Sequence, residues 1–303
     1  AYSAQDTVLA ADLFFLLAAS IMPVQRSSRR SSVSKNGTTK RSKASPKSRA
    51  KSPTRTSSHS STTFPTKMKR ILTFLLKTCL GLIALFLVIS LLAVFAYKWV
   101  PVYYTPLMVI RQVQGVEARG GGWQHRWVPL DSISPYLPVA AIAAEDQNFL
   151  KHNGFDYRAI LDAYEEAQEG GRVRGASTIS QQTAKNVFLW PHSSWVRKGF
   201  EAYFTVLIEW MWSKQRIMEV YLNSIEMGPG VYGAEAVAQE YFGCSARGLS
   251  RSQCALIVAT LPNPLEYSSK HPSRYMRKRQ RWIEVQMRAI PFLPKEEKTS
   301  QKP

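Results

Sequence analysis

The feature that most constrains this chain is an uncharged run of 20 residues, TCLGLIALFLVISLLAVFAY, from Thr78 to Tyr97. A helix needs about 20 apolar residues to cross the hydrocarbon core of a bilayer. Four lysine and arginine residues lie just before the run, at positions 67–77, whereas only Lys98 follows it closely. We therefore predict one membrane-spanning helix over 71–98, with a cytoplasmic N-terminus and the remainder of the chain outside.

The segment before this run has the composition of a disordered chain. Arg26 to Thr66 is rich in Ser, Thr, Lys, Arg and Pro and has no acidic residue, so it buries too little apolar surface to offset the entropy of ordering. The apolar run from Leu13 to Val24 is too short to span a bilayer. We predict a disordered basic extension over 1–70. Because Met68 stands directly before the basic flank of the span, we hypothesise that residues 1–67 are not part of the native chain.

The formal net charge of +19 is concentrated in the same N-terminal part. Up to Tyr97 there are 15 Lys and Arg against only Asp6 and Asp12, whereas from Lys98 onward 25 Lys and Arg face 19 Asp and Glu. The part that can fold is therefore only mildly basic, which suits an anionic substrate or a membrane surface. The tail has almost no aromatic residues to stack on bases, so we expect no nucleic-acid partner.

The region from 101 to 294 is predicted to be one compact, mainly α-helical domain, followed by a flexible tail over 295–303. Helical spacing and capping signals predict helices over 139–151, 178–188, 195–212, 214–224, 234–241, 250–261 and 273–289. Gly and Pro separate them, as at Gly228-Pro229-Gly230. Strand signals are confined to about Leu107 to Val128, which predicts a minor extended lobe. The three cysteines form no CxxC pair or Cys/His cluster, so neither a zinc site nor a disulfide framework is predicted.

The first candidate site is the motif AEDQNFLKHNGFD at 144–156. Two adjacent carboxylates, Glu145 and Asp146, close a predicted helix, with Ala141 and Phe149 one turn away from Glu145 on an apolar face. A carboxylate held beside apolar side chains is a candidate general base. Taken alone, such an acidic pair is more often a solvated helix end.

The second candidate is the motif GASTISQQTAKN at 175–186, a Gly-containing turn that leads into a helix with a capping-box pattern. Backbone N–H groups at a helix start bind anions, and Gln181, Gln182 and Lys185 fall within one turn of each other. This face could hold a phosphate or sugar hydroxyls, and the alternative is an ordinary capped amphipathic helix.

The third candidate is the motif RKGFE, in which Arg197 and Lys198 both reach Glu201 on one helix face. A solvated ion pair is the alternative, but the sequel up to Trp212 is almost wholly apolar, so the ion pair begins a buried helix. The three motifs together offer two separated carboxylates, an anion-binding helix start and several cations. Glycosyl transfer with a pyrophosphate leaving group requires this combination.

These motifs, with RIMEVYLNSIEMGPGVYGAEAVAQEYFG at 216–243 and ALIVATLPNP at 255–264, resemble those of the family 51 peptidoglycan glycosyltransferases, over about Val128 to Trp282. Similarity to the monofunctional members implies a lysozyme-like, mainly helical fold with a small jaw lobe near the membrane. It further implies elongation of glycan chains from lipid II by inverting transfer, with undecaprenyl pyrophosphate as leaving group, at the periplasmic face of the bacterial inner membrane. No transpeptidase activity is expected.

The resemblance also implies roles for individual residues. Glu145 would be the general base on the acceptor's sugar 4-hydroxyl, and Glu201 would be a second essential acid near the donor pyrophosphate. The residues implied to bind sugar and pyrophosphate are Ser177, Gln181, Gln182, Lys185, Asn186, Arg197 and Lys198. The sequence requires no cofactor and shows no metal site, although Mg or Mn beside the pyrophosphate is compatible with the family. The expected partners are lipid II, the growing glycan strand, the bilayer and cell-wall synthesis complexes.

Three positions depart from the family pattern. Ser193 stands where a basic residue is common, Cys244 replaces another commonly basic residue, and Gln253 replaces a Glu. None removes a carboxylate of the candidate site, so activity is expected, with weaker donor binding.

Two other functions remain open at this point. A lytic enzyme of lysozyme type would need a single acid and no cations for pyrophosphate, so Lys185, Arg197 and Lys198 favour synthesis over cleavage. A membrane-anchored scaffold would need neither Glu145 nor Glu201.

Overall fold

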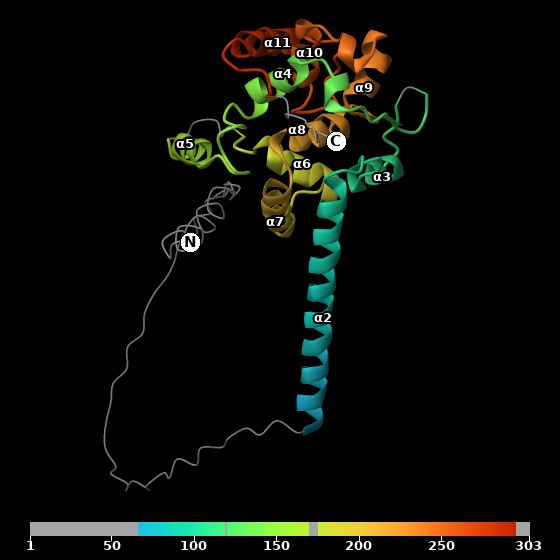
Figure 1. Cartoon of the computed structure of the whole chain (residues 1–303), viewed down its shortest axis with the longest axis vertical. Coiled ribbons are helices and arrows are strands. Elements are labelled where there is room, and N and C mark those ends of the chain that lie inside the picture. Colours follow the sequence, from blue (N-terminus) through green and yellow to red (C-terminus); the bar gives the residue numbers. More distant parts are fainter. Residues whose placement is uncertain (1–65, 119, 170–174, 295–303) are drawn as a thin grey trace, which may run out of the picture. The chain divides into compact units, whose positions relative to one another are not determined.

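The structure is a computed structural model that describes residues 66–118, 120–169 and 175–294 (Figure 1). The predicted extension and the predicted C-terminal tail therefore lie outside the described residues, apart from 66–70. The chain divides into two compact units, 1–83 and 84–303. Everything described of the first unit belongs to one helix, α2, whose side chains over 67–83 are exposed.

Helix α2 runs from Thr66 to Tyr97 and is the one described helix long and apolar enough to cross a membrane. It starts five residues before the predicted span at Ile71 and ends one residue before its predicted end at Lys98. Most of its leucine, isoleucine and phenylalanine side chains are exposed, as a lipid-facing helix requires. Within the second unit, Ser90 and Val94 of this helix are buried against the domain.

Three consecutive helices form the centre of the second unit: α6 (Ile179–Phe188), α7 (Trp195–Met211) and α8 (Lys214–Ser224). Each begins after a Ser or Thr whose side chain accepts a hydrogen bond from a backbone N–H of the first turn, namely Thr178, Ser194 and Ser213. Helix α6 packs against both α7 and α8. The predicted ranges of these helices are confirmed to within one residue.

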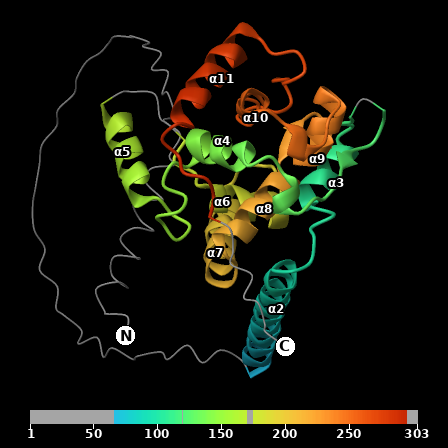
Figure 2. The ribbon, with the colours of Figure 1, turned by 45° about the horizontal axis from the view of Figure 1, so that its top comes forward.

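A second group of helices covers this centre. Helices α4 (Tyr136–Glu145), α10 (Arg251–Val258) and α11 (Arg274–Gln286) pack against one another, as Figure 2 shows. Helix α5 (Tyr157–Gln168), which the sequence analysis missed, follows the first motif. The short α9 (Ala234–Val237) continues into a π-helical turn over Ala238–Phe242, and 3₁₀ turns lie at Leu130–Ser132 and Ala246–Gly248.

The extended part is smaller than predicted. The three strands β1 (Gln124–His125), β2 (Glu226–Gly228) and β3 (Val231–Tyr232) form one sheet in the order β1-β3-β2, with β1 parallel and β2 antiparallel to β3. In its register, Gln124 pairs with Val231 and Glu226 with Tyr232. The prediction of strands from Leu107 was wrong, because α3 (Pro106–Val113) lies there. Thr105 caps α3, and Pro106 supplies a preset φ at its first position.

The C-terminal half of α2, from residue 84, is an integral part of the second unit. The Phe86 ring contacts Phe200 of α7 with centroids 5.5 Å apart, and Ser90 Oγ lies 2.7 Å from the hydroxyl oxygen of Tyr203. The Trp212 indole donates to the carbonyl oxygen of Val94 at 2.8 Å. The second unit therefore includes the last turns of the predicted membrane-spanning segment in its own hydrophobic core.

Candidate active site

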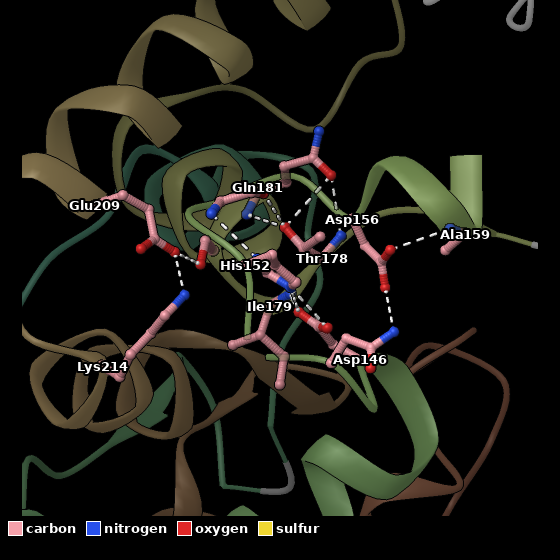
Figure 3. A network of polar contacts seen from close by, with 12 residues as sticks. Asp146, His152, Asp156, Ala159, Thr178, Ile179, Gln181, Glu209 and Lys214 are labelled. Carbon is pink, nitrogen blue, oxygen red and sulfur yellow. Dashed lines mark hydrogen bonds and ion pairs between the residues drawn. The ribbon is translucent and has the colours of Figure 1, made fainter. Parts of the chain in front are cut away.

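The first motif leaves its helix earlier than predicted. Helix α4 ends at Glu145 and not at Lys151, because the backbone of Asp146 leaves the helical conformation, with φ −162° and ψ 77°. The Asp146 carboxylate accepts hydrogen bonds from the Ile179 backbone N–H at 2.9 Å and from His152 Nε2 at 2.9 Å (Figure 3). His152 Nδ1 accepts from the Gly154 backbone N–H at 3.1 Å, so the ring carries its proton on Nε2. The two residues thus hold the first motif against the start of α6.

The start of α6 is fixed by a complete capping box. The Thr178 hydroxyl oxygen accepts from the Gln181 backbone N–H at 3.2 Å, and Gln181 Oε1 accepts from the Thr178 backbone N–H at 2.9 Å. The Thr178 hydroxyl also donates to the Gly154 carbonyl at 2.6 Å. Gln181 is buried, and this cap occupies its amide oxygen. Ser177 is exposed directly before the cap, and Asn186 is buried on the last turns of α6.

The carboxylate of Glu145 receives one donor on each oxygen. Gln182 Nε2 donates to Oε2 at 3.1 Å, and Arg279 Nη2 lies 3.5 Å from Oε1. The Tyr221 hydroxyl donates to Gln182 Oε1 at 3.2 Å, which fixes the amide with its nitrogen toward Glu145. Burial raises the pKa of Tyr221 well above its usual value, and the nearby carboxylates of Glu145 and Asp146 raise it further. Tyr221 is therefore a constant hydrogen-bond donor.

The second carboxylate, Glu201, is buried on α7 between two cations. Arg197 Nη1 lies 3.0 Å from Glu201 Oε2, and Lys198 Nζ pairs with Oε1. This arrangement matches the ion pair that the sequence spacing predicts.

Lys185 on α6 belongs to both carboxylate clusters. Burial lowers the pKa of Lys185, and repulsion by Arg197 and Lys198 lowers it further, whereas the charges of Glu201 and Glu145 oppose this shift. The lysine amine thus lies within electrostatic range of both acids, which come from different helices. A half-buried cation near two carboxylates is a suitable receptor for a phosphate.

A further polar group, which the sequence patterns did not single out, lies beside α6. Glu209, from the apolar part of α7, pairs with the Ser180 hydroxyl and with Lys214 Nζ, the latter at 2.7 Å. Lys214 also lies over the Phe149 ring, 4.6 Å from its centroid. The signal was present, because Glu209 is the one acidic residue within the apolar run of that helix.

Of the three departures from the family pattern, the structure explains one. Gln253 completes a capping box with Ser250, whose backbone N–H donates to Gln253 Oε1 at 2.8 Å. Gln and Glu serve equally in this motif, so the replacement preserves the start of α10. Ser193 is exposed in the turn before α7, and Cys244 is half-buried after the π-helical turn.

A lysozyme-like, mainly helical domain with two carboxylate centres, one of them surrounded by cations, defines the class as a glycosyl-transferring enzyme with an anionic substrate. Residues 113–288 match the family model described as Transglycosylase, and the chain belongs to this family as a peptidoglycan glycosyltransferase.

Relatives of similar length support this assignment. The chain is 55% identical over 235 residues to a biosynthetic peptidoglycan transglycosylase of Bacteroides thetaiotaomicron, covering 77% of this chain and 93% of that protein. Proteins of the same name from Caulobacter vibrioides and Pseudomonas fluorescens are 56% and 49% identical. Those alignments cover 67% and 72% of this chain and 87% and 91% of the relatives. Such an enzyme acts on a lipid-linked glycan and is associated with the membrane.

Proposed function

We propose that the protein elongates glycan strands from lipid II by inverting transfer, with undecaprenyl pyrophosphate as the leaving group and no transpeptidase activity. The observation that carries this proposal is that α6, which holds Glu145 through Gln182, packs against α7, where Glu201 pairs with two cations. An acid beside the acceptor and a cationic group beside the donor phosphate are then held within one site.

In this proposal Glu145 is the general base. Its carboxylate accepts the proton of the acceptor's sugar 4-hydroxyl while that oxygen attacks the anomeric carbon of the donor. The bond between the anomeric carbon and the pyrophosphate oxygen breaks as the new glycosidic bond forms, and attack from the opposite face inverts the configuration. The hydrogen bond from Gln182 holds Oε2 and leaves a lone pair of each oxygen for the incoming proton. A positioned base contributes roughly 10²–10⁴-fold in rate.

The departing pyrophosphate is neutralised by Lys185, Arg197 and Lys198. Glu201 orients the last two by direct ion pairing and keeps them beside the donor. Gln181, Asn186 and the exposed Ser177 complete the proposed sugar and pyrophosphate site. Both oxygens of Glu201 are engaged by cations, a donor set that does not favour a resident Mg or Mn, so charge neutralisation rests on these side chains.

We further propose that α2 is a single membrane span with a cytoplasmic N-terminus, which places the catalytic domain on the periplasmic side of the inner membrane. The excess of cations before Thr78 supports this orientation. A cysteine introduced in an exposed loop of the domain should react with a membrane-impermeant thiol reagent in spheroplasts. Labelling that occurs only after lysis would contradict this orientation and indicate a cytoplasmic domain.

The decisive experiment is incubation of the detergent-solubilised full chain with labelled lipid II, followed by a gel of the products. A ladder of muramidase-digestible strands is expected, and it should vanish in Glu145→Gln. Asp162→Asn, an exposed acid on α5, is the matched control and should keep full activity. Turnover retained in Glu145→Gln would refute the base assignment, and fragments released from preformed glycan would identify a lytic enzyme instead.

A further inference from the structure

Arg279 brings a cation to Glu145 from outside every motif that carries the family resemblance. It lies on α11, 134 positions after Glu145, and its Nη2 is 3.5 Å from Glu145 Oε1. Both side chains are largely shielded, with 25% of Arg279 and 15% of Glu145 exposed. Because the medium around such a pair is less polar than water, the attraction is stronger than that of a surface ion pair.

The packing of α11 fixes where this arginine points. Met276, Gln280 and Ile283 are buried at helical spacing on α11, which packs on α4 and α10. Gln280 Nε2 donates to the Ser252 carbonyl and hydroxyl oxygens of α10, both at 2.8 Å. Arg279 therefore leaves a helix that is held on both sides, and its guanidinium reaches the last residue of α4.

The guanidinium is only partly satisfied. Its Nε–H is shielded from solvent and has no hydrogen-bond partner among the described residues. Such a buried, unpaired donor costs about 1–3 kcal/mol. Nε and Nη2 lie on the same edge of the planar guanidinium, the edge that binds a carboxylate with two parallel hydrogen bonds. The unpaired donor thus shares an edge with Nη2, the nitrogen that contacts Glu145.

We propose that Arg279 is a positioning residue for Glu145, an inference that rests on the proposed role of Glu145 as base. Its Nη2 holds Oε1 while Gln182 holds Oε2, so the carboxylate meets the acceptor hydroxyl in one orientation. Its positive charge also attracts the carboxylate before the acceptor binds. After proton transfer the carboxyl is neutral and this attraction is lost.

Other charged or titratable groups also face Glu145 in the described part of the chain. They are Lys185 from α6 and Tyr221 from α8, with Asp146 beside it in sequence. Tyr221 remains neutral because burial raises its pKa, and Lys185 is shared with the Glu201 cluster. Among the described residues, Arg279 forms its ion pair with Glu145, and its removal should be visible in the pH dependence of turnover.

The test is the pH–rate profile of lipid II polymerisation by the full chain, for Arg279→Gln, Arg279→Lys and Arg281→Gln. Loss of a cation next to a carboxylate should move the acidic limb of kcat upward by about one pH unit. Turnover below that limb should then fall roughly tenfold and recover at higher pH. Arg279→Lys should restore the limb to its original pH, since it keeps the charge. Arg281, exposed on the same helix, should change neither rate nor profile.

An acidic limb that stays at the same pH in Arg279→Gln would overturn the inference. An equal loss of turnover at every pH in both Arg279→Gln and Arg279→Lys would also overturn it, because that result indicates a role in packing alone. If Arg279→Gln lacks a cooperative thermal transition, Arg279→Met, which fills the space without charge, must show the same displacement. The parallel Glu145→Gln assay separates the two proposals. An active Glu145→Gln refutes the base, whereas an inactive one with an unchanged Arg279→Gln profile refutes only the positioning role.

Discussion

Arg216 on α8 donates two hydrogen bonds to the backbone carbonyl of Tyr97, the last residue of α2, from Nε at 3.0 Å and from Nη2 at 2.8 Å. The same guanidinium pairs with Glu219 at 2.6 Å and lies over the Trp127 ring, 5.1 Å from its centroid. The last carbonyls of a helix have no partners within that helix. Arg216 therefore caps the anchor helix from the catalytic domain.

Replacing Arg216 should weaken the attachment of the C-terminal end of α2 to α8. In Arg216→Met, we expect the free energy of unfolding to fall by about 2 kcal/mol, because a charged donor to a carbonyl is lost while the apolar stem remains. Urea unfolding of the full chain in detergent measures this change. Arg281→Met, at an exposed position on α11, is the control, and its free energy of unfolding should equal that of the parent within error. Equal stabilities of the two variants would contradict the capping role.

Tyr221→Phe tests the chain of hydrogen bonds behind the proposed base. Without the hydroxyl, the Gln182 amide is free to turn its oxygen toward Glu145, so kcat should fall about fivefold while KM stays constant. Because the raised pKa keeps Tyr221 protonated, the alkaline limb of the pH–rate profile should be the same in both proteins. Tyr275→Phe, at an exposed position, serves as control. An alkaline limb that disappears with the hydroxyl would show that Tyr221 titrates during turnover.

Lys185 should give activity and stability opposite dependences on pH. Burial lowers its pKa, so the amine loses its charge as the pH rises, before an ordinary lysine does, and donor binding should weaken there. Between this lowered pKa and the ordinary 10.5, the unfolded chain holds more protons than the folded one, so stability rises with pH. Lys185→Arg, which stays charged, should abolish both trends. The two trends are measured as KM and as the free energy of unfolding in urea, each against pH. A KM profile in Lys185→Arg that is the same as in the parent would contradict the role of Lys185 in donor binding.

Gly154→Ala should destabilise the first motif through a clash. Gly154 has φ +93°, and a Cβ there would lie 2.8 Å from Thr205 Cγ2 and 3.0 Å from Glu209 Cγ. We expect the free energy of unfolding to fall by at least about 2 kcal/mol, from backbone strain and overpacking together. Gly243→Ala isolates the strain, because Gly243 has φ +64° and nothing within 4 Å of the added carbon. Thermal melting measures the loss of stability in both variants. Equal losses in Gly154→Ala and Gly243→Ala would show that the contact with α7 is unimportant.

Local signals predicted the central helices well. Thr178, Ser194 and Ser213 each combine a capping side chain with a following apolar face, so the ranges of α6, α7 and α8 follow from neighbours in sequence. The pairing of Arg197 and Lys198 with Glu201 also follows from helical spacing. The missed α3 carried a readable signal in Thr105 and Pro106, which the β-type residues around it obscured.

Other features depend on contacts between distant segments. Helix α4 stops at Glu145 because Asp146 binds the backbone of Ile179, a partner 33 positions away that no local pattern indicates. The contact of Arg279 with Glu145 joins helices that are separated by most of the domain. Such pairs become visible only once the helices are placed in space.

The burial of Val94 and the ring contact of Phe86 with Phe200 have a practical consequence for anyone who wishes to crystallise the catalytic domain without its membrane anchor. A truncation that begins at Lys98 would remove the Phe86 ring that packs on Phe200 and the carbonyl that accepts from the Trp212 indole. The apolar surface that α2 covers would then be exposed to solvent and would favour aggregation. A soluble variant is better made by keeping the last turns of α2 and replacing its outward-facing leucines with polar residues.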